Sequence, residues 1–264
     1  MDASMMTGSE SEKGISGSTL KLIAVISMLI DHTAAVVVEH MIFQLHSYVT
    51  WSMVFTDPLV TVYWIMRLIG RLAFPIYIFL LIQGLEHTRN QWKYLLRLFL
   101  LALISEIPFD FAFSLSSRQV FSGKIIEFTY QNVFFTLTIG LLAIIGMQSI
   151  EKTKLNIGLK ILIYFIFTVM GMGLGSLLQT DYDAIGVLAI IVMYLLRRQP
   201  MWAVAATCVV LLFSSYLEAS AFLILLPIAF YNGKRGWKLK WVFYIFYPVH
   251  LLVLWLICLM MGII

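Results

Sequence analysis

The chain has 264 residues, of which 61% are hydrophobic and only 12% are charged. A soluble domain carries about twice that share of charge, and no polar segment is long enough to fold alone, so a soluble protein is excluded. The net charge of +4 comes from basic residues in short loops between apolar runs, which excludes a nucleic-acid-binding surface. The composition indicates an all-α, polytopic integral membrane protein in contact with the lipid bilayer.

The N-terminal part divides into a polar tail and a first apolar run. Residues 1–18 show no apolar periodicity and are predicted to be a disordered tail, and residues 19–264 a single transmembrane domain. Residues 19–39 are long enough to cross a bilayer but contain Asp31 and His32. At 1.5 Å per residue, His32 lies about 16 Å along the helix, near the middle of the membrane. Ionisable groups there indicate a functional site, the alternative being a polar pair that joins two helices.

Further apolar runs follow along the chain. Five long ones are predicted to cross the membrane: residues 60–85, 94–113, 128–147, 159–178 and 242–261. Three shorter runs are residues 184–196, 202–216 and 219–231. Hydropathy does not separate short spans from a re-entrant hairpin in these three. The prediction is a bundle of about nine transmembrane helices.

The distribution of Lys and Arg predicts the orientation. A cytoplasmic N-terminus places ten or more of them in inner loops, at positions such as Arg89, Lys154 and Arg198, and leaves only Arg118 and Lys124 outside. Short cytoplasmic loops carry this excess of positive charge. The sequence therefore predicts a cytoplasmic N-terminus and an external C-terminus.

Several polar side chains are predicted to meet at similar depths. These are His32, Arg67, Arg71, Glu106 and His250. Arg67 and Arg71 are four residues apart and share one helix face, so they require anions, which Asp31, Glu106 and Asp110 can supply. A purely structural ion-pair cluster is the alternative for the arginines, and an interhelical hydrogen bond is the alternative for His250. The two cysteines have no metal-ligand spacing, and no metal site is predicted.

This set of groups suits two kinds of chemistry. A histidine oriented by a carboxylate can remove a proton from an attacking amine or hydroxyl. Arginines can stabilise a developing oxyanion or hold an anionic substrate. The groups therefore suit acyl transfer, and they would also suit proton-coupled transport.

Seven segments of the sequence resemble the TraX family, which is named for the F-pilin N-acetylation protein of conjugation systems. They read LKLIAVISMLIDH at 20–32, RLIGRLAFP at 67–75, LISEIPFD at 103–110, QNVFF at 131–135, DY at 181–182, YNGKRG at 231–236 and FYIFYPVHL at 243–251. The segments occur in the family's order and run from about Leu20 to the last helix. This family is similar to the wider group of transmembrane acyltransferases.

The resemblance implies a bacterial cytoplasmic-membrane enzyme that transfers an acetyl group from cytoplasmic acetyl-CoA to an amine or hydroxyl acceptor. The acceptor would be a peptide, a sugar or a small molecule, and a homo-oligomer is left open. His32 matches the proposed catalytic histidine of the wider group, as general base or transient acyl carrier, with Asp31 holding its tautomer. Arg67 and Arg71 would stabilise the oxyanion or bind the acceptor. The CoA phosphates would be held by the inner basic turn, with the residues Asn232, Lys234, Arg235, Lys238 and Lys240.

Two rival functions remain. One is a secondary transporter with Asp31, Glu106 and His250 as a proton relay, although the sequence lacks the internal repeat typical of transporters. The other is a non-enzymatic assembly factor of a conjugation or pilus system, in which the polar centre only specifies helix packing.

Overall fold

The computed structural model of the chain describes residues 14–114, 116–237 and 240–264, without the side chains of residues 117 and 240–243. Its longer helices are α1 (Gly17–Thr33), α4 (Pro58–Gly70), α5 (Ala73–Glu86), α6 (Gln91–Phe109), α8 (Val133–Glu151), α9 (Ile157–Leu177), α10 (Asp183–Leu195), α11 (Pro200–Leu211) and α13 (Lys240–Met261). Short helical segments are η1 (Ala34–Val38), α2 (Glu39–Leu45), α3 (Met53–Thr56), η2 (Asp110–Ser114), α7 (Ser117–Phe121), η3 (Tyr216–Ile224) and α12 (Leu225–Ala229). Within these residues two isolated bridges, Ile15–Tyr231 and Gln131–Thr180, are the only β pairing.

Five helical stretches are long and apolar enough to cross a membrane. They are Gly17–Leu45, Pro58–Glu86, Val133–Glu151, Ile157–Leu177 and Tyr244–Met261. The other predicted spans coincide with α6, which carries three charged residues, and with three helical stretches of 10–17 residues, namely α10, α11 and Tyr216–Ala229. The all-α membrane bundle is therefore confirmed for the described residues, while the count of nine crossings stays a prediction.

The first span is longer than predicted. It begins at Gly17 and continues through η1 and α2 to Leu45, so the boundary expected at residue 19 lies two residues late and the end at residue 39 lies six residues early. The prediction of a disordered tail is wrong for residues 14–18, because Ile15 pairs with Tyr231, Ser16 caps α1 and α1 begins at Gly17, while residues 1–13 lie outside the described residues. A longer helix leaves His32 close to the middle of the span.

Polar residues define where the helices start. The side chains of Ser16, Asp57, Asn90, Asn132 and Asn156 each accept a hydrogen bond from a backbone N–H in the first turn of the following helix. These N–H groups have no partner within the helix, and an N-terminal cap satisfies them.

Prolines interrupt two of the spans close to the polar centre. Helix α4 ends at Gly70 and α5 starts at Ala73, and Pro75 has no N–H to donate to the carbonyl of Arg71. Helix α6 contains Pro108 and changes into the π-helical turn η2 at Asp110. In both spans the interruption lies next to ionisable side chains, so it shapes the backbone that carries them.

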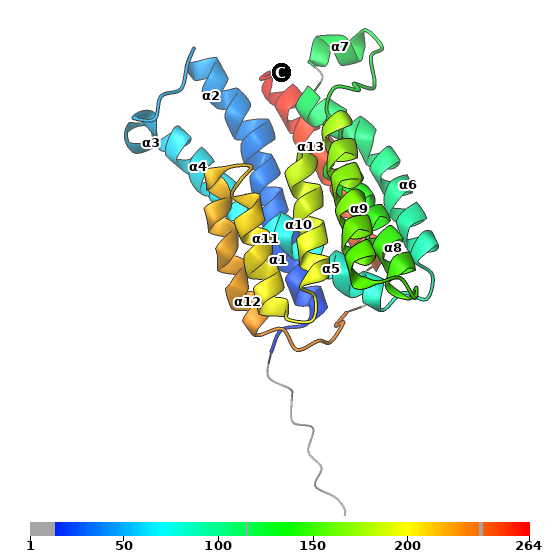
Figure 1. Cartoon of the computed structure of the whole chain (residues 1–264). Coiled ribbons are helices and arrows are strands. Elements are labelled where there is room, and N and C mark those ends of the chain that lie inside the picture. Colours follow the sequence, from blue (N-terminus) through cyan, green and yellow to red (C-terminus); the bar gives the residue numbers. More distant parts are fainter. Residues whose placement is uncertain (1–13, 115, 238–239) are drawn as a thin grey trace, which may run out of the picture.

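The longer helices lie side by side in one bundle (Figure 1). The main apolar core joins α1, α5, α8, α10 and α11, and a second core cluster joins α1, η1, α6 and α13. Helix α9 lies at the outside, because only 6% of its apolar stretch is buried. The start of α1 and the C-terminus of the chain lie at opposite ends of the bundle (Figure 1).

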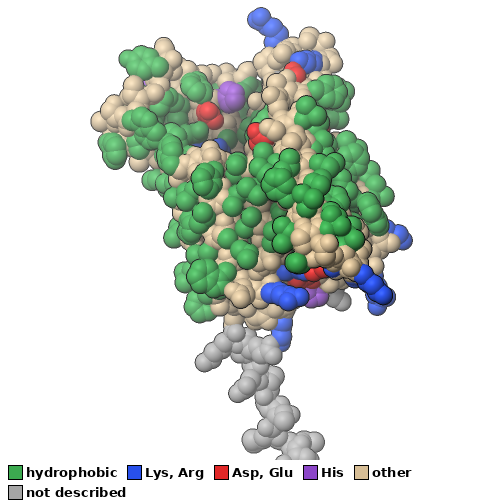
Figure 2. Space-filling view, in the orientation of Figure 1, with side chains coloured by type: hydrophobic (Ala, Val, Ile, Leu, Met, Phe, Trp, Pro, Cys, Tyr) green, Lys and Arg blue, Asp and Glu red, His purple; other side chains and the backbone are tan. Residues whose placement is uncertain are grey.

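Most basic side chains gather at one end, the lower end in Figure 2. Arg197, at the end of α10, forms ion pairs with Glu86 of α5 at 3.6 Å and with Glu151 of α8 at 3.4 Å. The backbone N–H of Gly17 donates to the carbonyl of Lys234 at 2.8 Å. These contacts place the predicted inner loops at the same end, which we call the basic end.

Candidate functional site

Two histidines from the first and last helices meet inside the bundle. His32 Nδ1 of α1 lies 2.7 Å from His250 Nε2 of α13, and the two rings are stacked at a centroid distance of 5.0 Å. Phe113 and Tyr247 contact His32 edge-on at 5.5 and 5.9 Å. The structure thus brings together two predicted site residues that are 218 positions apart.

The hydrogen bonds of this pair determine the tautomers of the neutral rings. His250 Nδ1 lies 2.8 Å from the carbonyl oxygen of Phe246, which can only accept, so Nδ1 carries the proton and Nε2 accepts. His32 Nδ1 must then donate to His250, which leaves the lone pair of His32 on Nε2. Protonating either ring would place a positive charge in the interior of the membrane domain, which is costly. Two neutral imidazoles are therefore the favoured state. His32 Nε2 therefore carries the lone pair, and His250 orients the ring.

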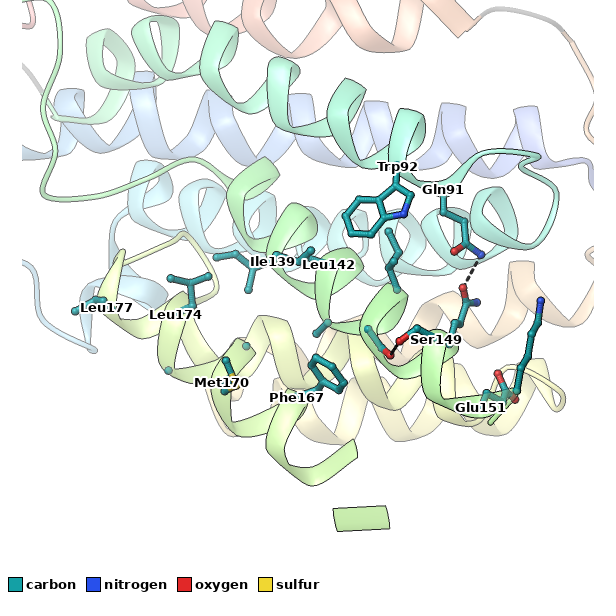
Figure 3. A pocket seen from close by; sticks show the side chains of 17 residues that line it. Gln91, Trp92, Ile139, Leu142, Ser149, Glu151, Phe167, Met170, Leu174 and Leu177 are labelled. Carbon is teal, nitrogen blue, oxygen red and sulfur yellow. Dashed lines mark hydrogen bonds between the residues drawn. The ribbon is translucent and has the colours of Figure 1, made fainter. Parts of the chain in front are cut away.

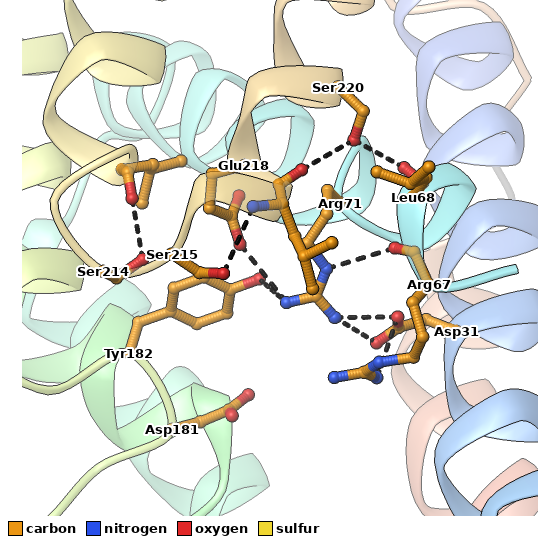
Figure 4. A network of polar contacts seen from close by, with 12 residues as sticks. Asp31, Arg67, Leu68, Arg71, Asp181, Tyr182, Ser214, Ser215, Glu218 and Ser220 are labelled. Carbon is orange, nitrogen blue, oxygen red and sulfur yellow. Dashed lines mark hydrogen bonds and ion pairs between the residues drawn. The ribbon is translucent and has the colours of Figure 1, made fainter. Parts of the chain in front are cut away.

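A second cluster surrounds Arg71 (Figure 4). One of its nitrogens donates to both carboxylate oxygens of Asp31 at 2.7 Å, and another donates to Glu218 at 3.2 Å. Arg67 completes the cluster with an ion pair to Asp31 at 2.9 Å, and the Tyr182 hydroxyl accepts from Arg71 at 3.5 Å. The carboxylates of Asp31 and Glu218 thus pair with the guanidinium groups of Arg67 and Arg71. Buried charges require such pairing.

The role expected for Asp31 needs correction. Its carboxylate accepts from Arg67 and Arg71, whereas the nitrogen Nδ1 of His32 bonds to His250. Neighbouring residues of a helix point about 100° apart, so Asp31 and His32 address different partners. Gly70 of α4 permits this approach, because a Cβ atom there would overlap the Asp31 carboxyl group.

The anions expected for the arginines also need correction. Asp31 is one, but the other is Glu218 of η3, and within the described residues no ion pair joins Glu106 or Asp110 to a cation. Glu106 instead accepts from the backbone and side-chain amides of Asn132. Glu218 was missed by the sequence reasoning, although an acid between two apolar runs was the available signal. Tyr182 was noticed only as part of a motif.

Asp110 holds a loop at the end opposite the basic end. Its carboxylate accepts from the backbone N–H of Glu127 at 2.7 Å. The Glu127 side chain pairs with Lys124 at 2.5 Å and accepts from Thr129, and these hydrogen bonds lower the pKa of Glu127 to about 2. Asp110 therefore has a structural partner of its own.

A cavity of about 580 Å³ runs from the basic end to Tyr247, and neither His32 nor His250 is among the residues that line it. Its mouth includes Lys21, Arg97 and Arg235, and its apolar inner wall includes Phe134 and Tyr247. Since the Tyr247 ring contacts His32 and His250 at 5.9 and 5.6 Å, the inner wall adjoins the histidine pair. Lys21 and Arg97 were not predicted as site residues, because their spacing in sequence gives no sign that they share a cavity.

Part of the predicted basic turn lies at this mouth. Arg235 lines the cavity, while the Asn232 side chain accepts from the backbone N–H of Lys234 at 3.0 Å and so closes the turn. Lys238 lies outside the described residues, as does the side chain of Lys240. The turn is attached to the start of α1 by backbone bonds from Ser18 to Arg235 and from Asn232 to Ile15, both 3.0 Å long.

A larger hollow of about 1010 Å³ lies along α8 and α9 (Figure 3). Its wall is mostly apolar, and a hydrogen bond of 2.5 Å joins Gln91 to Gln148 at one end. None of the residues of the histidine pair or the arginine cluster lines it. It is separate from the polar centre.

Comparisons with known proteins confirm the family resemblance that was identified from the sequence segments. The profile of the family described as TraX protein matches residues 16–258. The chain is 29% identical over 255 residues to the "Probable fimbrial assembly protein FimC, serogroup H1" of Dichelobacter nodosus, covering 89% of this chain and 92% of that one. No solved structure matches the chain. Since the family profile spans nearly the whole bundle, including both histidines and both arginines, the chain belongs to the TraX family.

Proposed function

We propose that the protein is an acetyltransferase that moves an acetyl group from cytoplasmic acetyl-CoA to an amine or hydroxyl acceptor. The observation that carries this proposal is the cavity that opens among basic side chains and ends at Tyr247, beside the His32–His250 pair. The basic end would face the cytoplasm of a bacterial cell, since short cytoplasmic loops are enriched in Lys and Arg. The acyl donor would then approach from the side where it is made.

The mouth of the cavity suits the charged part of CoA. Lys21, Arg97 and Arg235 line it, and Lys234 belongs to the same turn as Arg235. Charge-assisted hydrogen bonds from such groups hold phosphates. The apolar interior suits the pantetheine arm and the acetyl group. Lys238 and Lys240 follow this turn in sequence and belong to the same proposal.

In the transfer step His32 Nε2 would take the proton from the attacking acceptor. The acceptor nitrogen or oxygen forms a bond to the carbonyl carbon of the thioester, and the carbon–sulfur bond breaks. His32 then passes the proton to the leaving thiolate, so the products are the acetylated acceptor and free CoA. His250 keeps the lone pair of His32 on Nε2, which is the positioning role first assigned to Asp31.

The arginines fit a positioning role better than direct contact with the thioester. Arg71 already bonds Asp31, Glu218 and the carbonyl of Arg67, so an oxyanion would have to displace a carboxylate. By fixing Asp31, the cluster fixes the rotation of α1 and hence the direction of His32.

One alternative retains support, and the contacts speak against the other. The relative from Dichelobacter nodosus is named a fimbrial assembly protein, which favours a part in pilus or fimbria assembly, either through acetylation of a component or without chemistry. A proton relay would use Asp31, Glu106 and His250, but these groups have separate partners here: Asp31 bonds arginines, Glu106 bonds Asn132 and His250 bonds His32.

The test is release of free CoA by purified protein supplied with acetyl-CoA and peptide, sugar or small-molecule acceptors. His32→Ala should lower turnover by about 10²–10⁴-fold, the usual contribution of a general base, while acetyl-CoA still binds. His250→Ala should lower it less, because the base remains. His40→Ala is the matched control, since that ring bonds only the carbonyl of Val36 among the described contacts. Normal turnover in His32→Ala would contradict the mechanism, and absence of acetyl-CoA binding in the parent would contradict the function.

A further inference from the structure

We propose that the hydroxyl group of Tyr247 donates a hydrogen bond to the carbonyl oxygen of the acyl donor and stabilises the negative charge that develops there. This inference rests on the proposed acetyl transfer and assigns the electrophilic half of the site. The arginines, which the sequence suggested for this task, have carboxylate partners.

The first observation is an unpaired polar atom. Tyr247 is only 2% exposed, and its hydroxyl has no hydrogen-bond partner among the described residues. Buried hydroxyl groups nearly always have a partner, because leaving one unpaired is unfavourable. A ligand that brings a carbonyl oxygen to this hydroxyl would satisfy it.

The second observation is where this side chain lies. Tyr247 forms part of the wall of the 580 Å³ cavity. Its ring lies edge-on to His32, to His250 and to Phe134 at centroid distances of 5.9, 5.6 and 4.7 Å. It precedes His250 by three residues, so both side chains project from one face of α13. The hydroxyl-bearing ring therefore lines the cavity, and the proposed base, which does not line it, contacts that ring.

The two groups have complementary tasks in the reaction. As the acceptor attacks, the π electrons of the carbonyl move onto its oxygen, and the Tyr247 hydroxyl donates a hydrogen bond without giving up its proton. When the carbonyl re-forms, the thiolate leaves and takes the proton held by His32. A neutral donor fixed in an apolar cavity needs no reorganisation when the charge appears, which makes it effective.

The experiment compares Tyr247→Phe with the parent and with Tyr164→Phe on α9, which does not line this cavity. Loss of an oxyanion donor should lower kcat by about 10²–10³-fold and leave acetyl-CoA affinity and Tm nearly unchanged. A packing role would instead lower Tm and leave kcat intact, which would overturn the proposal. Turnover within threefold of the parent would also overturn it.

A spectroscopic measurement separates this inference from the proposed function. In the His32→Ala background, ¹³C-acetyl-CoA should bind without turnover, and its carbonyl stretch should appear at lower wavenumber than in water. Adding Tyr247→Phe should abolish that shift, whereas adding Tyr164→Phe should retain it. An unchanged shift would refute the role of Tyr247, while failure to bind acetyl-CoA in every variant would refute the proposed function. If Tyr247→Phe does not fold, 3-fluorotyrosine at position 247 should enlarge the shift, and an unchanged shift would again refute the proposal.

Discussion

Asp31→Asn should destabilise the protein by leaving the arginine cluster with an uncompensated charge. In the parent, Asp31 and Glu218 balance Arg67 and Arg71. The amide has the shape of the carboxylate but no charge, so the variant cluster carries one excess positive charge. Removing one partner of a buried ion pair costs about 3–5 kcal/mol.

The expected loss lies at the lower end of that range, at about 3 kcal/mol. The Arg67 side chain is 22% exposed, so water can partly solvate it, whereas Arg71, at 13%, keeps its bond to Glu218. Arg67→Gln combined with Asp31→Asn should recover most of the stability, because it restores neutrality. Recovery by the second substitution would identify charge balance as the cause.

The assay is reversible unfolding in mixed micelles, with Glu86→Gln as the matched control. That substitution also changes a carboxylate into an amide, but Glu86 pairs with Arg197 near the surface and its loss should cost less than about 1 kcal/mol. A loss below 1 kcal/mol for Asp31→Asn, or no recovery in the double variant, would refute the account of this cluster.

Two further predictions concern the basic end. Lys21→Gln with Arg235→Gln should weaken acetyl-CoA binding and reduce its salt dependence, since exposed charge contacts are screened; titration calorimetry at two ionic strengths measures both, and unchanged values would move the CoA site elsewhere. Cysteines at Leu155 and Gln199 should resist a membrane-impermeant thiol reagent in intact cells, whereas one at Gly123 should react; the opposite pattern would invert the proposed orientation. The native Cys208 and Cys258 are buried and should contribute little background.

Composition and the lengths of the apolar runs were sufficient to predict the helical membrane bundle, because spans of apolar residues are directly visible in sequence. The meeting of His32 with His250 was suggested by their similar depth, and the structure provides the contact. Depth alone could not assign partners within the polar centre. Rotation about the helix axis directs Asp31 towards the arginines and His32 towards His250, and that rotation depends on packing such as the close approach at Gly70.

Glu218 shows a second limit of sequence reasoning. It lies in a 3₁₀ segment between two short apolar runs, where the sequence does not indicate whether the chain crosses the bilayer or turns back. Its depth could not be assigned without the tertiary structure. Tyr247 illustrates the same limit, because an aromatic residue in an apolar helix is ordinarily a packing residue, and only the three-dimensional structure reveals its unpaired hydroxyl.

The pairing of the first helix with the last has a consequence for biogenesis. His32 and His250 are separated by 218 positions. During synthesis, α1 therefore enters the membrane long before its partner helix α13 has been made, and His32 has no partner until nearly the whole chain has been inserted. Contacts between distant parts of a chain form slowly, and a chain truncated before α13 would expose the imidazole to lipid or to other helices. Quality-control proteases could therefore distinguish finished from unfinished molecules by whether α13 has docked on α1.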